Sequence, residues 1–120
     1  MKAQGKRQKG SRLERKVAEL IRRFDLDKNA KRMVLSGGDW AFRGDINTIL
    51  PFTFECKSQE KMKFWEWWQQ AEDQAKPMKP PVLVHSSNYR PIIVSMKIET
   101  FLDILKELKD YKDINNDKKN

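Results

Sequence analysis

The sequence predicts one α/β domain in which a mixed β-sheet of about five strands is flanked by helices. Three segments have the spacing of apolar residues that is typical of helices, and short β-forming runs lie between them. From residue 52 to residue 85, a β-forming run, a helical segment and a second β-forming run follow one another. This order predicts a right-handed crossover within one sheet, and 120 residues suit a single core.

The first helix is expected to begin at Ser11. Residues 1 to about 10 are basic, lack apolar periodicity and are expected to form a flexible arm. Ser11 is a favourable N-cap residue, and Glu14 follows it at the spacing of a capping box. The helix should fade between residues 25 and 29. Its buried stripe is expected to comprise Leu13, Val17, Leu20, Ile21 and Phe24.

Short β-forming runs at residues 32–35, 45–50 and 52–57 predict strands, and residues 36–39 predict a turn. Residues 40–43 are ambiguous. The last two runs are expected to pair as a hairpin. Because side chains alternate between the faces of a strand, this hairpin would have one apolar face, made of Ile46, Leu50, Phe52, Phe54 and Cys56.

The second predicted helix covers roughly residues 62–76 and ends at Pro77, since proline disrupts a helix interior. Apolar strands are expected at residues 81–85 and 91–96, with a turn at residues 86–90 between them. The helix should bury Phe64, Trp68, Ala71 and Ala75, whereas Trp65 and Trp67 should point elsewhere.

The last predicted helix covers residues 98–108, and a polar tail at about residues 110–120 is expected to fray. No internal repeat or linker divides the chain, so one domain is expected to span residues 1–120. The last helix should direct four side chains inward, namely Phe101, Leu102, Leu105 and Leu108.

The composition excludes several kinds of site. Cys56 is the only cysteine and His85 the only histidine, so an internal disulfide and a Cys/His metal cluster are excluded. A histidine-based nucleophilic triad is disfavoured for the same reason. Gly37-Gly38 marks only a turn, and the sequence has no glycine-rich phosphate loop. The single cysteine fits a reducing compartment, so a cytoplasmic location is expected.

The charge balance indicates the class of partner. The 25 Lys and Arg residues exceed the 17 Asp and Glu residues, which gives a net charge of +8 and favours a polyanionic partner. Nucleic acid is favoured over charge that serves solubility alone, because several basic residues cluster near the N-terminus. A membrane partner is not expected, since no apolar segment is long enough to span a bilayer and nothing resembles a signal peptide.

The polar face of the predicted hairpin carries two carboxylates and a lysine that could form a metal site. The apolar pattern places Asp45, Glu55 and Lys57 on one face, with Asp45 opposite Glu55. Opposed carboxylates repel unless a cation lies between them, and carboxylate oxygens suit Mg²⁺. Such an ion could activate a water molecule, and Lys57 could stabilise charge on a phosphoryl group. A solvated sheet face with chance charges is an equally good explanation of the hairpin.

The order of these residues resembles the PD-(D/E)XK nucleases. The resemblance rests on Glu14 in the first helix, Gly44-Asp45, and Glu55-Cys56-Lys57 in the next strand. Gly44 departs from the pattern, which commonly has proline there. The local sequence looks most like archaeal-type Holliday junction resolvases and their phage relatives, over most of residues 5–105. The segments that carry this likeness are KGSRLERKVAELI, GDI and FECKSQEKMKFWEWWQQAEDQA.

The resemblance implies a restriction-endonuclease-like core and roles for individual residues. Asp45 and Glu55 would bind Mg²⁺, with Mn²⁺ as a substitute. Glu14 would complete the metal site, although the capping box is an alternative explanation of this residue. Lys57 would be the catalytic lysine.

The resemblance also suggests residues around this site. Gln70 matches a polar residue on the helix after the lysine motif, although a simple exposed position explains it equally well. Ser36 lies in the loop where related resolvases carry a serine that is important for cleavage. Basic residues near the site would contact DNA phosphates and give salt-dependent affinity. They are Lys6, Arg7, Lys9, Arg12, Arg15, Arg43, Lys61 and Lys63.

These observations predict a Mg²⁺-dependent, structure-selective DNA endonuclease. Its expected substrate is branched DNA, namely the four-way (Holliday) junction, cut by paired symmetric nicks in recombination, repair or phage DNA processing. The resolvases that it resembles are homodimers, so a two-fold dimer is expected, with Trp65 or Trp67 at the interface. A phage-encoded enzyme would act in the host cytoplasm. The alternatives are another structure-selective or nonspecific nuclease of the superfamily, and a non-catalytic DNA-binding module.

Overall fold

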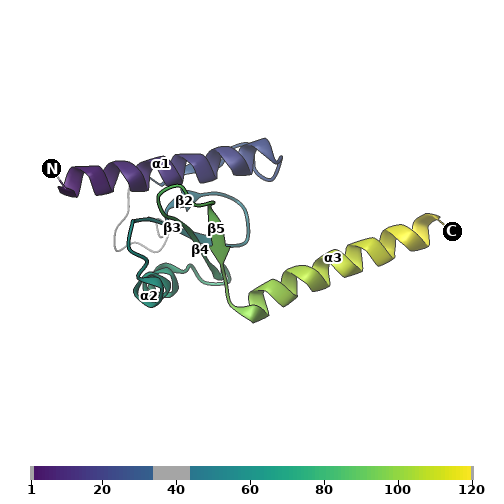
Figure 1. The fold of residues 1–120 in the computed structure, drawn as a ribbon. Helices are drawn as coiled ribbons and strands as arrows, with labels where there is room; N and C mark the ends of the chain where they lie inside the picture. Colours follow the sequence, from purple (N-terminus) through teal and green to yellow (C-terminus); the bar gives the residue numbers. More distant parts are fainter. Residues whose placement is uncertain (1, 34–43, 120) are drawn as a thin grey trace.

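The computed structural model describes residues 2–33 and 44–119 of the chain (Figure 1). The expectations for residues 34–43, which include Ser36 and Arg43, lie outside the described residues. The elements in chain order are α1 (Lys2–Arg23), β1 (Lys31–Arg32), β2 (Ile46–Asn47), β3 (Thr53–Ser58), α2 (Phe64–Gln74), β4 (Pro81–Ser86), β5 (Ile93–Ser95) and α3 (Ile98–Lys119).

Three strands form a mixed sheet in the order β3-β4-β5. β3 and β4 are parallel and are connected through α2, which confirms the expected strand–helix–strand crossover. β5 returns antiparallel to β4. β1 and β2 form a separate two-stranded antiparallel sheet. The described strands are therefore divided between two sheets, whereas the sequence predicted one.

The hairpin expected from residues 45–57 does not form. β2 comprises only Ile46–Asn47 and pairs with β1. Directly after β2, the carboxylate of Asp27 accepts hydrogen bonds from the Thr48 hydroxyl (2.6 Å) and the Ile49 N–H (3.0 Å). These bonds turn the chain toward the end of α1, so β2 stops before it can pair along β3.

Asp27 is buried and anchors the loop after α1. Its other carboxylate oxygen accepts a hydrogen bond from the Asn29 N–H (2.9 Å). The Thr48 hydroxyl, followed by the Ile49 and Asn29 N–H groups, lowers the pKa of Asp27. Because this pKa is lower in the folded chain than in the unfolded chain, the network stabilises the fold above the ordinary aspartate pKa. That stability is lost as the pH falls through the lowered pKa.

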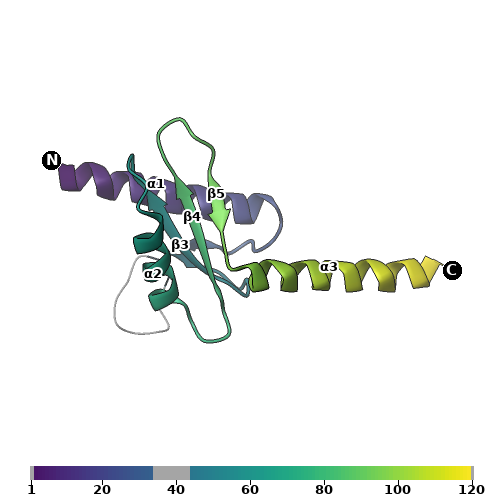
Figure 2. The ribbon, with the colours of Figure 1, turned by 60° about the horizontal axis from the view of Figure 1, so that its bottom comes forward.

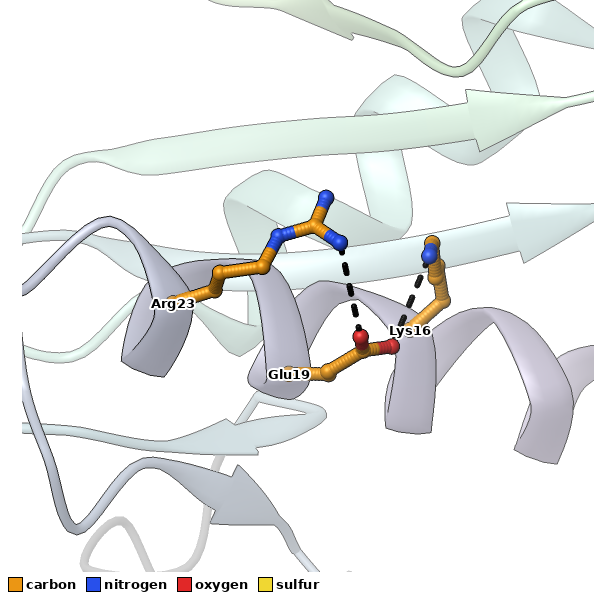
Figure 3. A network of polar contacts seen from close by, with 3 residues as sticks. All are labelled: Lys16, Glu19 and Arg23. Carbon is orange, nitrogen blue, oxygen red and sulfur yellow. Dashed lines mark hydrogen bonds and ion pairs between the residues drawn. The ribbon is translucent and has the colours of Figure 1, made fainter.

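Helix α1 begins at Lys2, well before the expected start at Ser11. The segment expected as an arm therefore has a helical backbone, and Ser11 lies inside the helix instead of capping it. The residues before Ser11 are rich in Lys, Arg and Gln, which favour helix without creating an apolar stripe. Periodicity therefore could not reveal them. On the exposed surface of α1, Glu19 forms ion pairs with Lys16 (3.4 Å) and Arg23 (3.8 Å), as Figure 3 shows.

Helix α1 covers one face of the three-stranded sheet, and α2 lies on the other side (Figure 1). Phe24 departs from the prediction, since it is exposed beyond the end of α1 at Arg23. The rest of the apolar pattern on this face is largely confirmed. The buried cluster comprises Leu13, Val17, Ala18, Ile21, Ala30, Ile46, Cys56, Val82 and Val84, with Leu50, Phe52 and Phe54 packed against it.

Helix α2 covers the other face of the sheet. Trp67 and Ala71 belong to a cluster around Leu83 of β4, which is fully buried. The prediction for Trp67 is wrong, since this side chain is only 4% exposed. The centre of its ring lies 6.3 Å from the centre of the His85 ring on β4. The indole of Trp67 therefore covers the sheet beside the apolar stripe that was predicted for α2. Trp65 is exposed, as expected.

Helix α3 continues to Lys119, so the expected fraying after residue 110 is not observed. The ion pairs Lys106–Asp110 (2.8 Å) and Lys109–Asp113 (3.7 Å) support its polar half. The expected inward packing is wrong, because α3 leaves the sheet and points away from α1 and α2 (Figure 2). The side chains expected in the core are 42–52% exposed, namely Phe101, Leu102, Leu105 and Leu108.

Within the described chain, no helix is apolar and long enough to cross a membrane.

Replacement of Leu83 by alanine should lower the free energy of unfolding by about 2–5 kcal/mol, because a fully buried side chain leaves a cavity. Urea denaturation followed by circular dichroism measures this loss. Ile49→Ala is the matched control, since Ile49 is 80% exposed. The control should change stability by less than about 0.5 kcal/mol. Equal destabilisation by both substitutions would contradict the α2 core.

Candidate active site

The edge of β3 that faces away from β4 positions Asp45. β3 is the outer strand of its sheet and pairs with β4 on one side. On its other side, the Asp45 N–H donates to the Phe54 carbonyl (2.8 Å), and Asp45 Oδ2 accepts the Cys56 N–H (2.7 Å). These bonds place Asp45 beside Glu55, which lies between the two bonded residues. The predicted proximity of Asp45 and Glu55 is therefore present, although the predicted hairpin is not.

Gly44 allows this close approach. Its φ is +86°, in the left-handed region that residues with side chains rarely adopt. A Cβ atom at this position would lie 2.8 Å from Thr53 Cγ2 and 3.3 Å from the Phe54 carbonyl oxygen. Proline, whose φ is fixed near about −65°, could not replace Gly44 in this backbone. The departure from the nuclease pattern at this position therefore has a local structural reason.

A pocket of about 390 Å³ lies between α1 and the end of β3. It brings together the four residues to which the sequence assigned the main chemical roles: Glu14, Asp45, Glu55 and Lys57. Glu55 and Lys57 share a face because side chains two residues apart in a strand point the same way. The pocket is also lined by Arg32, Ser58 and Gln59, which the sequence did not predict at this site.

Burial raises the pKa values of the carboxyl groups in this pocket. Glu55 is buried, and this burial, reinforced by the charge of Asp45, raises the pKa of Glu55 to about 8 although Lys57 opposes the shift. Burial also raises the pKa of Asp45, against the lowering effects of the Cys56 N–H and of Lys57. Without a cation, the carboxyl group of Glu55 therefore retains its proton to a higher pH than an exposed glutamate does.

Glu14 reaches the pocket from α1. Because α1 begins at Lys2, Glu14 lies inside the helix, and the capping box does not explain this residue. Its carboxylate pairs with the guanidinium group of Arg32 (Nε–Oε2 3.1 Å). Burial and the charge of Asp45 raise the pKa of Glu14, and Arg32 opposes them. Arg32 thus holds Glu14 at the wall of the pocket.

The oxygen donors of the pocket fit a hard divalent cation. Asp45 and Glu55 present carboxylate oxygens in an open pocket, which is the ligand type that Mg²⁺ prefers when it retains several water molecules. A cation between them would also offset the effect of Asp45 on the pKa of Glu55. Within residues 2–33 and 44–119, no three acidic, histidine or cysteine side chains form a ready-made metal cluster. The candidate ligands are therefore this pair.

Cys56 is not suited to be a nucleophile. Its side chain is buried in the core under α1, and it is a free thiol. Burial raises the pKa of this thiol well above its ordinary value, so the thiolate is disfavoured at neutral pH. Its backbone N–H, which holds Asp45, is the part of Cys56 that serves the site.

The remaining sequence-predicted residues are not all brought to the pocket. Gln70 is exposed on α2 and is not among the lining residues. Arg12, Arg15, Lys61 and Lys63 are exposed on α1 and on the segment after β3, the two elements that border the pocket. The other basic residues, Lys6, Arg7 and Lys9, lie within α1, and their side chains are outside the described part.

The fold and the site together define a class of protein. An α/β domain with an aspartate at the edge of a strand that carries Glu-x-Lys is typical of the PD-(D/E)XK nucleases. The model of the family described as "Phage putative PDDEXK endonuclease" matches residues 5–120, so the chain belongs to this family. Neither the curated proteins nor the solved structures gave a significant match.

In metal-free solution, stability should fall as the pH rises from the ordinary glutamate pKa of 4.5 to about 8. In this interval folded Glu55 keeps a proton that the unfolded chain has released, so rising pH favours unfolding. Glu55→Gln should reduce this fall by roughly 1–3 kcal/mol, since one pKa unit corresponds to about 1.4 kcal/mol. Urea denaturation with EDTA at several pH values measures the slope.

The control for this prediction is Glu66→Gln, which changes an exposed carboxyl group on α2. It should retain the pH dependence of the wild type. If Glu55→Gln also retained that dependence, the raised pKa of Glu55 would be wrong.

Proposed function

We propose that this chain is a metal-dependent DNA endonuclease whose reaction takes place in the pocket between α1 and β3. The observation that carries the proposal is the meeting of Asp45, Glu55 and Lys57 in one open pocket. Buried carboxyl groups with raised pKa values weaken the fold at neutral pH, and such groups cluster at functional sites. Membership of a PD-(D/E)XK family supports the same chemistry.

Asp45 and Glu55 are proposed to hold Mg²⁺, with Mn²⁺ as a substitute. The bound ion would supply Lewis-acid chemistry toward a DNA phosphodiester. Asp45 uses Oδ2 to accept the Cys56 N–H, and its Oδ1 is the proposed ligand atom. Since Glu55 must release its proton to bind a cation, the affinity for the ion should rise with pH.

Lys57 is proposed as the catalytic lysine. It lines the pocket on the same face of β3 as Glu55. An ammonium group in this place can orient a water molecule for in-line attack and stabilise the negative charge that develops on the phosphate. Glu14, held by Arg32, is proposed to support the site from α1. Gln70 and Ser36 have only the resemblance in their favour.

Four-way DNA junctions are the proposed substrate. The local sequence resembles Holliday junction resolvases, and exposed basic residues lie on α1 and on the segment after β3, which both contribute lining residues to the pocket. These charges would give salt-dependent affinity for DNA phosphates without reading the base sequence. Another branched DNA or a linear duplex is the alternative substrate for the same chemistry.

Addition of Mg²⁺ should stabilise the wild type against thermal unfolding, because a ligand of the folded state shifts the equilibrium by mass action. At an ion concentration of about 100 Kd the gain should be about 2.7 kcal/mol. Asp45→Asn should abolish the gain, and Glu66→Gln should retain it. Differential scanning calorimetry measures the shift. An undiminished gain in Asp45→Asn would place the ion elsewhere.

With Mg²⁺, the protein should cut a synthetic four-way junction by paired symmetric nicks, and EDTA should stop the reaction. Asp45→Ala or Glu55→Ala should abolish cutting while junction binding persists, since the basic surface is unchanged. Lys57→Ala should slow cutting by about 10²–10³-fold, as for the loss of one charge-stabilising donor. End-labelled strands on denaturing gels measure the rates.

A linear duplex of matched sequence is the control substrate. Equal cutting of the duplex would support the nuclease activity and reject the four-way junction as the specific substrate. Binding without cutting in any divalent metal would favour the DNA-binding module. Normal cutting by Glu55→Ala would contradict the assigned site.

A further inference from the structure

The apolar side chains of α3 face water. Figures 1 and 2 both show α3 extending away from the sheet, with its far end well separated from α1 and α2. An ion pair between Lys97, the residue before α3, and Glu72 of α2 (3.8 Å) joins these two elements at one end. Seven large apolar residues of α3 are 42–66% exposed, namely Ile98, Phe101, Leu102, Leu105, Leu108, Tyr111 and Ile114.

These side chains form a stripe of the kind that packs between two helices. Ile98, Phe101, Leu105 and Leu108 recur at alternating spacings of three and four residues, the pattern of a helix–helix seam. The ion pairs between residues 106 and 110 and between residues 109 and 113 bring together polar side chains outside this seam. Monomeric proteins rarely expose contiguous apolar patches larger than a few hundred Å². We therefore expect another surface to cover this stripe.

The charges along α3 indicate what covers it. Its first half, residues 98–108, has three acidic side chains against one lysine, whereas its second half, residues 109–119, has four lysines against three aspartates. In an antiparallel pair of identical helices, the acidic half of one faces the basic half of the other. A parallel pair would place like charges side by side, which is unfavourable. The charge pattern is thus complementary to a second copy of α3 in one orientation.

We propose that α3 is a homodimer interface, in which it packs antiparallel against α3 of a second copy of this chain. The apolar stripe is centred near Leu105, so this residue would lie close to the two-fold axis. Ile98 would then lie near Lys112 of the second copy, whose long methylene chain can cover it. The interface is self-complementary, as two-fold symmetry requires. It does not depend on the proposed nuclease activity.

This arrangement would separate the two nuclease sites. Each domain precedes α3 in the chain, and the pairing places the starts of the two helices on opposite sides of the axis. At a rise of about 1.5 Å per residue, the two Ile98 positions would lie roughly 20 Å apart along the helix pair. If the proposed function holds, the dimer would present two sites to two strands of one junction.

Sedimentation equilibrium of the full chain tests the interface. The wild type should dimerise, and Leu105→Glu should weaken dimerisation by at least about 100-fold, because it buries a charge at the seam. Lys106→Gln is the matched control, since it changes a polar side chain one residue along without adding a negative charge and removes only an exposed ion pair of little worth. The control should dimerise like the wild type, and so should the nuclease variant Asp45→Asn.

Circular dichroism checks that Leu105→Glu is folded, and Leu102→Lys provides a second variant on the stripe. A wild type that stays monomeric at all accessible concentrations would overturn the proposal. So would a folded Leu105→Glu variant that dimerises normally. In either case the exposed stripe would have another occupant or none.

Cysteine cross-linking tests the orientation. Leu105→Cys should form a disulfide-linked dimer under mild oxidation, because the two residues would meet at the axis. Ile98→Cys should cross-link with Lys112→Cys in a mixed sample and not with itself. Cys56 is buried and should not interfere. Efficient self-cross-linking of Ile98→Cys would indicate parallel helices and overturn the antiparallel interface.

Discussion

The two hydrogen bonds between Asp45 and the edge of β3 that faces away from β4 are the constraint on which the site depends. An outer strand has backbone groups that need partners, and Asp45 provides one donor and one acceptor for Phe54 and Cys56. The same contacts fix the aspartate beside Glu55. Gly44 makes them possible, because a side chain at this position would collide with Thr53. One local backbone arrangement thus ends the sheet and assembles the carboxyl pair.

The buried carboxyl groups of the site reduce the stability of the fold at neutral pH, whereas a solvated sheet face would not. Burial raises the pKa values of Glu14, Asp45 and Glu55, so each carboxylate is less favourable here than in water. Two cations offset part of this cost. Lys57 lowers the pKa of Glu55, and Arg32 pairs with Glu14 of α1. Proteins tend to keep such locally unfavourable groups where function requires them. The electrostatics and the family membership therefore support the same chemistry.

The sequence predicted the proximity of Asp45, Glu55 and Lys57 better than it predicted the strand pairing. Alternation along residues 52–57 separated the apolar face from the charged face, because that pattern depends only on the strand itself. The hairpin was wrong because Asp27, far away in sequence, turns the chain after β2. The two-residue strand that carries Arg32 is too short for periodicity, so no signal in the sequence could have revealed the contact of Arg32 with Glu14. The apolar spacing of α3 predicted a buried face but could not indicate which molecule covers it.

Anomalous diffraction from wild-type crystals soaked in Mn²⁺ tests most directly the central claim that Asp45 and Glu55 hold a divalent cation. The expected result is a peak within coordination distance of a carboxylate oxygen of each residue, lost in crystals of Asp45→Asn. A fully occupied ion that contacts neither carboxylate, or a peak between them that persists in Asp45→Asn, would contradict the claim. In that case the carboxyl pair at the β3 edge would need another explanation.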